Sequence, residues 1–239
     1  MILGMLKYHL LMLVREPANM FFGFGLPFLN LFLMSGSFDE GNLDALDIAF
    51  PMFITIAILV LCFTDAALSH ASSRQTKFLR RLKMTPVAPS TYLLTGIIIR
   101  LGVIVAFAGL FSVVTSVAFG LSLLNRNWLI ILGVLMLTFT MFYFIAMFLA
   151  NVFKSPRTSQ SALNIIFWIF LLLGNLFMPT NAMPEILCVI SQNTPTVYAL
   201  NLLQSAWLGA DLFYGHSFIV VIGITIAFGV LSAKFFKYE

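Results

Sequence analysis

The chain has 239 residues, of which 61% are apolar and only 9% are charged, and its mean hydropathy is +1.02. Soluble globular domains carry about 25% charged residues, so this composition excludes a soluble domain. A bilayer core about 30 Å thick needs roughly 20 apolar residues per helical span, and the chain is long enough for about six spans. We therefore predict a polytopic membrane protein with an all-α fold, forming a single transmembrane domain over residues 1–239.

The N-terminal segment, residues 1–19, has an amphipathic pattern. Leu6, Leu10 and Leu13 recur at helical spacing, while Lys7 and Arg15 are available to a polar face. This pattern is typical of a helix that lies on the membrane surface, and it differs from the apolar core of a cleavable signal peptide. We expect an interfacial helix that leads into the first span.

Six long apolar runs follow the N-terminal segment. They cover residues 20–36, 48–68, 93–124, 128–152, 160–178 and 216–236. Stretches such as "IIFWIFLLLGNLFM" are continuously apolar, whereas a membrane β-barrel requires short segments of alternating polarity. The runs therefore predict six transmembrane helices.

The loop between the second and third spans, residues 69–92, is strongly basic. It holds five of the 13 Lys and Arg residues of the chain, namely Arg74, Lys77, Arg80, Arg81 and Lys83. On a helix that ends at Pro86, the side chains of Phe78, Leu79 and Leu82 share one face, and cations share another. Two interpretations stay open: the cations fix membrane orientation and bind anionic headgroups, or the helix docks to a cytoplasmic partner.

The segment between the fifth and sixth spans, residues 179–215, contains Pro179, Pro184 and Pro195. Its apolar pieces, "ILCVI" and "VYALNLLQSAWLG", are too short to cross a bilayer. We predict a re-entrant outer hairpin of short helices.

The cations are distributed unequally between the two sides of the predicted topology. With six spans, both termini share one side, and that side collects 11 of the 13 cations: Lys7, Arg15, Arg74, Lys77, Arg80, Arg81, Lys83, Lys154, Arg157, Lys234 and Lys237. Only Arg126 lies in a loop on the other side. By the positive-inside rule, both termini are cytoplasmic in an inner (plasma) membrane. The net charge of +4 thus reports topology, and we do not take it as a sign of nucleic-acid binding.

Two ionisable residues lie within spans, Asp65 in the second and Arg100 in the third. Intramembrane charges are functional candidates by default. Either the two form a structural ion pair, or Asp65 borders the interface and Arg100 reaches it along its flexible stem. A proton relay is disfavoured because no second intramembrane acid is present.

Four polar residues within the predicted spans are candidates for a substrate path: Asn30, Thr55, Asn164 and Asn175. Such residues also serve as polar contacts between membrane helices. Both interpretations stay open.

Two stretches carry a resemblance to a known family. They are "LKMTPVAPSTYLLTG", preceded by Arg81 and containing Thr85, Pro86, Tyr92 and Gly96, and the proline-broken "FMPTNAMPEIL" with the following "QNTPTVYALN". Together with the order of helices, they make essentially the whole chain similar to the membrane subunits of ABC-2 type transporters. The resemblance implies that the first cytoplasmic loop is a coupling helix seated in an ATPase cleft. Its coupling residues would be Arg74, Lys77, Phe78, Leu79, Arg80, Arg81, Leu82 and Lys83.

Nucleotide and metal motifs are missing from the sequence. There is no G-x-x-x-x-G-K-[ST] and no Gly-Lys dipeptide, so we expect ATP and Mg²⁺ to bind a partner ATPase, and we expect this chain not to be an enzyme. His9, His70 and His216 do not have metal-ligand spacing, and Cys62 and Cys188 lie too far apart in the predicted topology to bridge.

These inferences favour the permease subunit of an ATP-binding cassette exporter that moves a hydrophobic drug, peptide or lipid-linked substrate. It would work with two ATPase subunits and with a second copy or a homologous permease. One alternative is an ion-coupled secondary transporter, which predicts inverted repeats and more buried acids. Another is a non-transporting immunity or sensor protein on the same scaffold.

Overall fold

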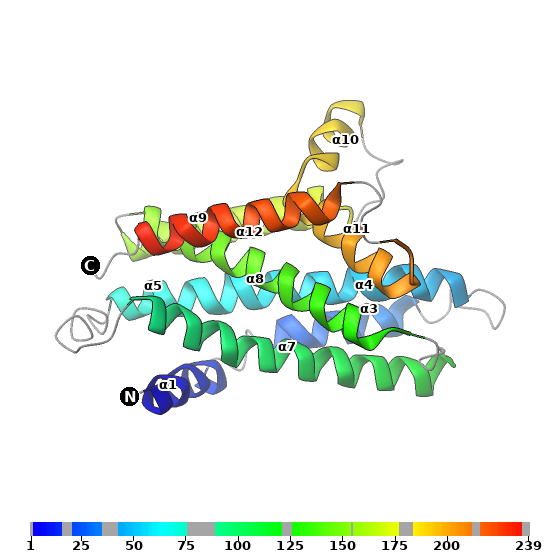
Figure 1. Ribbon diagram of the computed structural model, residues 1–239, viewed down its shortest axis with the longest axis horizontal. Helices are drawn as coiled ribbons and strands as arrows, with labels where there is room; N and C mark the ends of the chain where they lie inside the picture. The colour runs from blue at the N-terminus through cyan, green and yellow to red at the C-terminus, as the bar shows by residue number, and fades with distance from the viewer. Residues whose placement is uncertain are drawn as a thin grey trace.

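The computed structural model describes residues 2–15, 21–34, 43–75, 89–120, 126–153, 155–176, 184–211 and 216–235. Every regular element within these ranges is a helix, which confirms the all-α prediction. The long helices lie side by side in one bundle, and both chain termini lie at the same end of it (Figure 1).

The elements begin with α1 (Ile2–Arg15), the π-helical η1 (Phe21–Gly25) and α3 (Leu26–Met34). Next come α4 (Leu43–Leu59), the π-helical η3 (Val60–Ala66), α5 (Ala67–Gln75), α7 (Pro89–Phe119) and α8 (Trp128–Val152). The last are α9 (Pro156–Leu173), α10 (Glu185–Gln192), α11 (Pro195–Leu208) and α12 (Ser217–Lys234).

Four described helices are long and apolar enough to cross a membrane: Leu46–Arg74, Thr91–Phe119, Trp128–Val152 and Ser217–Lys234. The apolar helix at the predicted fifth span, Arg157–Leu173, is shorter, and the described part of the predicted first span covers only residues 21–34. The multi-pass prediction therefore holds for four spans, and the count of six stays a prediction.

The core is built around one continuous helix formed by α4, η3 and α5. In the apolar stretch of 18 residues that represents this helix as a candidate span, 83% is buried, a larger share than in the corresponding stretches of α7, α8 and α12. α8, α9 and α11 pack around it. The prediction ended this span at Leu68, but the helix runs on through Gln75. Part of the predicted basic loop, up to Gln75, is therefore the extension of a bundle helix.

α1 packs against the start of α7 (Figure 1). Met5, His9 and Leu13 recur every four residues and are buried, whereas Lys7 and Leu10 are exposed. The predicted amphipathic helix is present, and its buried stripe carries a histidine. Whether it lies at a membrane surface stays a prediction.

The predicted hairpin contains two unlike helices. α11 is buried against the bundle, whereas α10 projects from it with an exposed apolar face (Figure 1). Thr194 caps α11, because its hydroxyl accepts a hydrogen bond from the Val197 amide, and Pro195 occupies the first turn where no amide donor is needed. The depth of these helices in a bilayer stays a prediction.

Candidate functional site

Seven of the eight predicted coupling residues lie outside the described residues: Lys77, Phe78, Leu79, Arg80, Arg81, Leu82 and Lys83. The two helices that flank this segment are described. α5 ends at Gln75 and α7 begins at Pro89, and both of these helix ends lie at the end of the bundle where the chain termini lie (Figure 1). The candidate site is therefore built from the helices on either side of residues 76–88.

The structure corrects the predicted position of Arg74. The sequence placed it on the polar face of the loop helix, but its side chain is only 5% exposed. Its guanidinium donates to the carbonyl oxygens of Ala150, at 2.9 Å, and Phe153, at 3.1 Å. These carbonyls belong to the C-terminal end of α8, where intrahelical partners run out and a cation is favourable. Arg74 therefore fastens the end of α5 to the end of α8.

Asp65 and Arg100 are in direct contact. Arg100 Nε donates to Asp65 Oδ2 at 2.6 Å. The Arg100 side chain is 1% exposed and the Asp65 side chain is 4% exposed. An arginine this deeply enclosed does not reach an interface, so the contact favours the ion pair over the alternative of two separate interfacial charges. Asp65 lies in the π-helical η3 and Arg100 lies in α7. The pair therefore joins the helix that leads into residues 76–88 to the helix that leads away.

α1 contributes two side chains to the same region. The ring of His9 lies 4.8 Å from the ring of Tyr92 in α7, measured between centroids. The hydroxyl groups of Tyr8 and Ser73 are hydrogen-bonded at 2.7 Å, which links α1 to α5. α1 is therefore held to both helices that flank the segment.

His70 of α5 and Asn151 of α8 lie in the same region as these contacts. His70 Nε2 lies 3.0 Å from Asn151 Oδ1, and the Asn151 amide group donates to the Met147 carbonyl at 2.8 Å. The His70 ring also lies 5.7 Å from the Tyr92 ring, so α5, α7 and α8 meet at this point. Tyr143 of α8 lies against α7 here, because its hydroxyl donates to the Leu93 carbonyl. We call the set Tyr8, His9, Asp65, His70, Ser73, Arg74, Tyr92, Arg100, Tyr143 and Asn151 the buried polar cluster.

Gly96 supplies the space that brings α8 and α1 against α7. A Cβ at this position would lie 2.4 Å from the Tyr143 hydroxyl oxygen and 3.4 Å from His9 Cε1. The Tyr143 hydroxyl donates to the Leu93 carbonyl at 3.3 Å. A glycine that the sequence singled out only through a family resemblance thus has a steric role in the cluster.

Burial lowers the pKa of His9 to about 3, and the positive charge of Arg100 acts in the same direction. The opposing effect of the Tyr92 backbone is smaller. His9 is therefore neutral at physiological pH while α1 is docked. Burial also raises the pKa of Tyr8.

The structure describes the side chains of three of the four residues predicted to face a substrate path. Thr55 is fully buried and donates to the Pro51 carbonyl of its own helix at 2.7 Å. Asn164 lies on the exposed face of α9, whereas Asn175 follows that helix with a positive φ of 57°. The side chain of Asn30 lies outside the described residues. The Thr55 hydroxyl therefore bonds within its own helix, and a substrate path along these residues stays a prediction.

A second polar cluster, which the sequence did not predict, lies at the opposite end of the bundle. Arg126 forms an ion pair with Asp47 at the start of α4, and its guanidinium lies 4.3 Å from the centre of the Trp207 ring. The Trp207 indole N–H donates to Asp47 Oδ1 at 3.1 Å. The sequence held one indication of this cluster, because Arg126 is the single cation that the predicted topology places in a loop on the side opposite the termini.

The described residues show no group of three His, Cys, Asp or Glu side chains that could hold a metal ion. Cys62 is buried in η3, and both it and Cys188 are free thiols.

The family model for the ABC-2 type transporter matches residues 2–208, which include both polar clusters and α1 through α11. The chain belongs to this family. The resemblance inferred from the motifs is thereby confirmed, and the chain is a transmembrane component of permease type. No curated protein matched the chain.

Proposed function

We propose that this chain is the membrane permease subunit of an ATP-driven exporter in the inner (plasma) membrane, with both termini cytoplasmic. It works as a homodimer or with a homologous permease, together with two cytoplasmic ATPase subunits that bind ATP and Mg²⁺. Membership of the ABC-2 type transporter family supports this proposal, because such permeases typically work with a separate ATPase. The substrate class that fits short outer loops is a hydrophobic drug, a peptide or a lipid-linked molecule.

The buried Asp65–Arg100 pair is the observation that carries the mechanism. It connects the helix on the N-terminal side of residues 76–88 to the helix on the C-terminal side. When the ATPases close on ATP, the coupling helix within residues 76–88 is displaced. Because the pair fastens the two flanking helices together, they move as one unit and not independently.

The rest of the buried polar cluster extends that unit. Arg74 holds α5 to the end of α8, and Tyr8 and His9 hold α1 to α5 and α7. A displacement at the coupling helix therefore acts on four elements at once. The continuous helix of α4, η3 and α5 then reaches the opposite end, where Asp47 contacts Arg126 and Trp207.

The contact between Asp65 and Arg100 also weighs against an ion-coupled secondary transporter. A coupling carboxylate must be able to take up and release an ion during each cycle. Asp65 is the intramembrane acid that the sequence offered, and Arg100 neutralises it at 2.6 Å. We therefore assign Asp65 a structural role in the coupling unit.

The test is to purify the chain with its genomic ATPase neighbour and reconstitute both in inverted vesicles. Uptake of a fluorescent hydrophobic substrate should require ATP and should stop when the ATPase active site is inactivated. Uptake driven by an ion gradient without ATP would support the secondary transporter. Binding of a toxic peptide without any uptake would support the immunity protein.

A further inference from the structure

The contact between Asp65 and Arg100 joins one carboxylate oxygen to one guanidinium nitrogen, at 2.6 Å. The other carboxylate oxygen, Asp65 Oδ1, and the guanidinium nitrogen Arg100 Nη2 are both buried, and neither has a hydrogen-bond partner among the described residues. A buried charged group that is left short of hydrogen bonds has lost its hydration without replacement, which is costly. The two atoms therefore require a further polar partner.

One small molecule can serve both atoms. Asp65 Oδ1 belongs to the same carboxylate as the bonded Oδ2, and Arg100 Nη2 has an N–H that points in the same direction as the bonded Nε–H. A water with two hydrogen bonds of ordinary length spans about 5.6 Å. Because Oδ1 accepts and Nη2 donates, a water has the donor and acceptor that the two atoms lack.

A third buried atom without a partner lies on α1. His9 is 3% exposed, and its Nε2 has no hydrogen-bond partner among the described residues. The ring is hydrogen-bonded to the Tyr92 backbone, which leaves Nε2 as the acceptor of the neutral ring. His9 Cε1, the atom next to Nε2, lies 3.4 Å from the position of a Gly96 Cβ. Gly96 precedes Arg100 by four residues, so His9 lies on the same face of α7 as Arg100.

The side chains around these atoms keep bulk solvent away. Arg100 is 1% exposed, and Tyr143, whose hydroxyl also lies beside the Gly96 position, is 0% exposed. The Tyr143 hydroxyl donates to the Leu93 carbonyl at 3.3 Å, which is long for a hydroxyl donor, and its oxygen can still accept a bond. The missing partner is therefore a molecule enclosed within the bundle.

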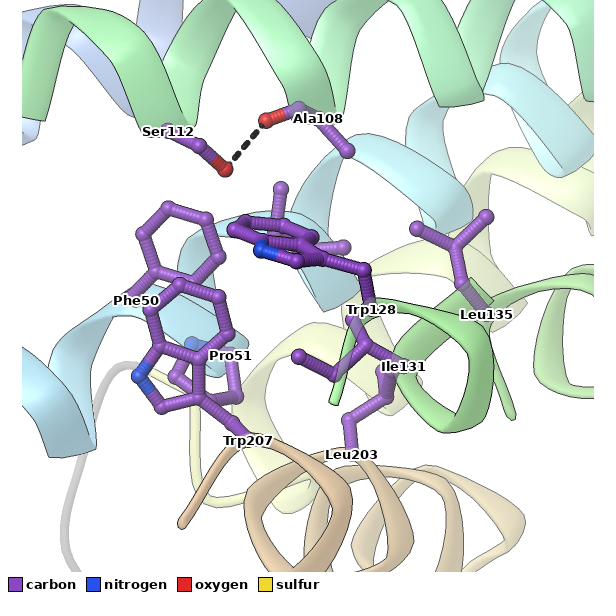
Figure 2. A pocket seen from close by; sticks show the side chains of 10 residues that line it. Phe50, Pro51, Ala108, Ser112, Trp128, Ile131, Leu135, Leu203 and Trp207 are labelled. Atoms are coloured by element: carbon purple, nitrogen blue, oxygen red, sulfur yellow. Dashed lines mark hydrogen bonds between the residues drawn. The ribbon is translucent and has the colours of Figure 1, made fainter. Parts of the chain in front are cut away.

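An apolar pocket at the opposite end of the bundle provides a contrast. It encloses about 30 Å³, and Phe50 and Trp207 are among the residues that line it (Figure 2). The Ser112 hydroxyl donates to the Ala108 carbonyl of its own helix at 2.7 Å, as Figure 2 shows, and the Trp207 indole N–H donates to an acid outside the pocket. A buried water needs two to four polar partners, and these groups offer it none. We expect this pocket to be dry.

We propose that the buried polar cluster holds an ordered internal water, which accepts a hydrogen bond from Arg100 Nη2 and donates to Asp65 Oδ1 and His9 Nε2. The water completes the hydrogen bonding of the two buried charges. It also joins α1 to the contact between η3 and α7. The site follows from the packing of the cluster and does not rest on the transport function.

Radiolytic hydroxyl-radical footprinting of the full chain in lipid nanodiscs tests this site, because an X-ray pulse turns a bound water into radicals that oxidise the side chains beside it. Tyr143 is the reporter, and Phe50 at the dry pocket is the control. After correction for intrinsic reactivity, Tyr143 should be oxidised about fivefold faster or more, although Phe50 is 4% exposed and Tyr143 is 0% exposed. Equally slow oxidation of the two rings would overturn the proposal.

A pair of substitutions removes the partners of the water. Asp65→Leu with Arg100→Met replaces both charges by apolar side chains, a change that buried ion pairs often tolerate, and it should lower Tyr143 oxidation to the level of the dry pocket. Asp47→Leu with Arg126→Met is the matched control at the other end of the bundle and should leave Tyr143 oxidation unchanged. Undiminished oxidation in the Asp65 and Arg100 variant would overturn the proposal.

If the Asp65 and Arg100 variant does not fold, a density map of the unmodified protein that resolves ordered waters gives the decision. We expect a peak within hydrogen-bond distance of both Asp65 Oδ1 and Arg100 Nη2. A protein side chain at these atoms, or a peak that appears only in chloride buffer, would overturn the proposal.

Discussion

Asp65 and Arg100 are the charges most completely removed from solvent in the described part of the chain. A buried pair is of uncertain net value to stability, because desolvation offsets the attraction between the charges. Removing one partner is costly in every case, because it leaves a single charge without compensation. The buried atoms Asp65 Oδ1 and Arg100 Nη2 have no hydrogen-bond partner among the described residues, so the pair depends on its one short contact.

The pair predicts a non-additive mutant cycle. Asp65→Asn or Arg100→Gln alone should lower stability by about 3 to 5 kcal/mol, whereas the double variant should recover much of that loss. The midpoint of thermal unfolding in detergent and the folded yield measure the effect. Asp47→Asn with Arg126→Gln is the matched control, because that pair is partly exposed and should cost less. Losses that add in the Asp65 and Arg100 cycle would refute the coupling of the two charges.

At the scale of elements, the polar end of the second span was the main error of the sequence interpretation. "SHASSRQ" has the composition of a loop, yet these residues continue the helix. The helix persists because its polar side chains have partners on other elements. Ser73 bonds to Tyr8 of α1, whereas His70 bonds to Asn151 and Arg74 bonds to the Ala150 carbonyl, both in α8. Such partners are distant in the sequence and leave no periodic signal. α8 was predicted with its observed bounds, because residues 128–152 form a long, mostly apolar run. In the structure Asn127 caps this helix, because its side chain accepts a hydrogen bond from the Ile130 amide.

The docking of α1 should depend on pH through His9. Above pH 6.5 the histidine is neutral whether α1 is docked or free, so pH has no effect through this group. Below pH 6.5 the free form takes up a proton that the docked form, with a pKa of about 3, does not. Docking should therefore weaken between pH 6.5 and 3, by roughly tenfold per pH unit. Tyr92, Arg100 and His70 face this ring, and none of them supplies a compensating negative charge.

Hydrogen exchange of the α1 amides at pH 7.5 and pH 5, corrected for the intrinsic rate, measures this dependence. His9→Gln should remove most of it, whereas the exposed control His216→Gln should not. An undiminished pH dependence in His9→Gln would assign the effect to another group.

At the scale of the whole molecule, two polar clusters lie at opposite ends of an apolar bundle, and one continuous helix reaches both. The sequence predicted the apolar helices, the family and the Asp65–Arg100 candidates, because composition, periodicity and isolated intramembrane charges are local signals. It did not predict the contact of Asp47 with Arg126 and Trp207, because these residues are 79 and 160 positions apart from Asp47.

The predicted orientation gives a labelling pattern. In right-side-out cells, tags at either terminus and cysteine labels at positions 77 and 154 should be protected, while labels at positions 44 and 185 should react. The reason is the strong excess of cations on the side of the termini. Reaction of a label at position 77 from outside would reverse the orientation.

The central claim, that residues 76–88 couple an ATPase to the bundle, is tested most directly by ATPase co-purification with loop variants. Leu82→Asp should abolish co-purification while the permease still inserts, because a central apolar anchor is typically worth about 2 kcal/mol or more. Lys77→Ala is the matched control and should lose little, because a solvated rim charge is worth about 0 to 1 kcal/mol. Normal co-purification and ATPase stimulation in Leu82→Asp would contradict the account.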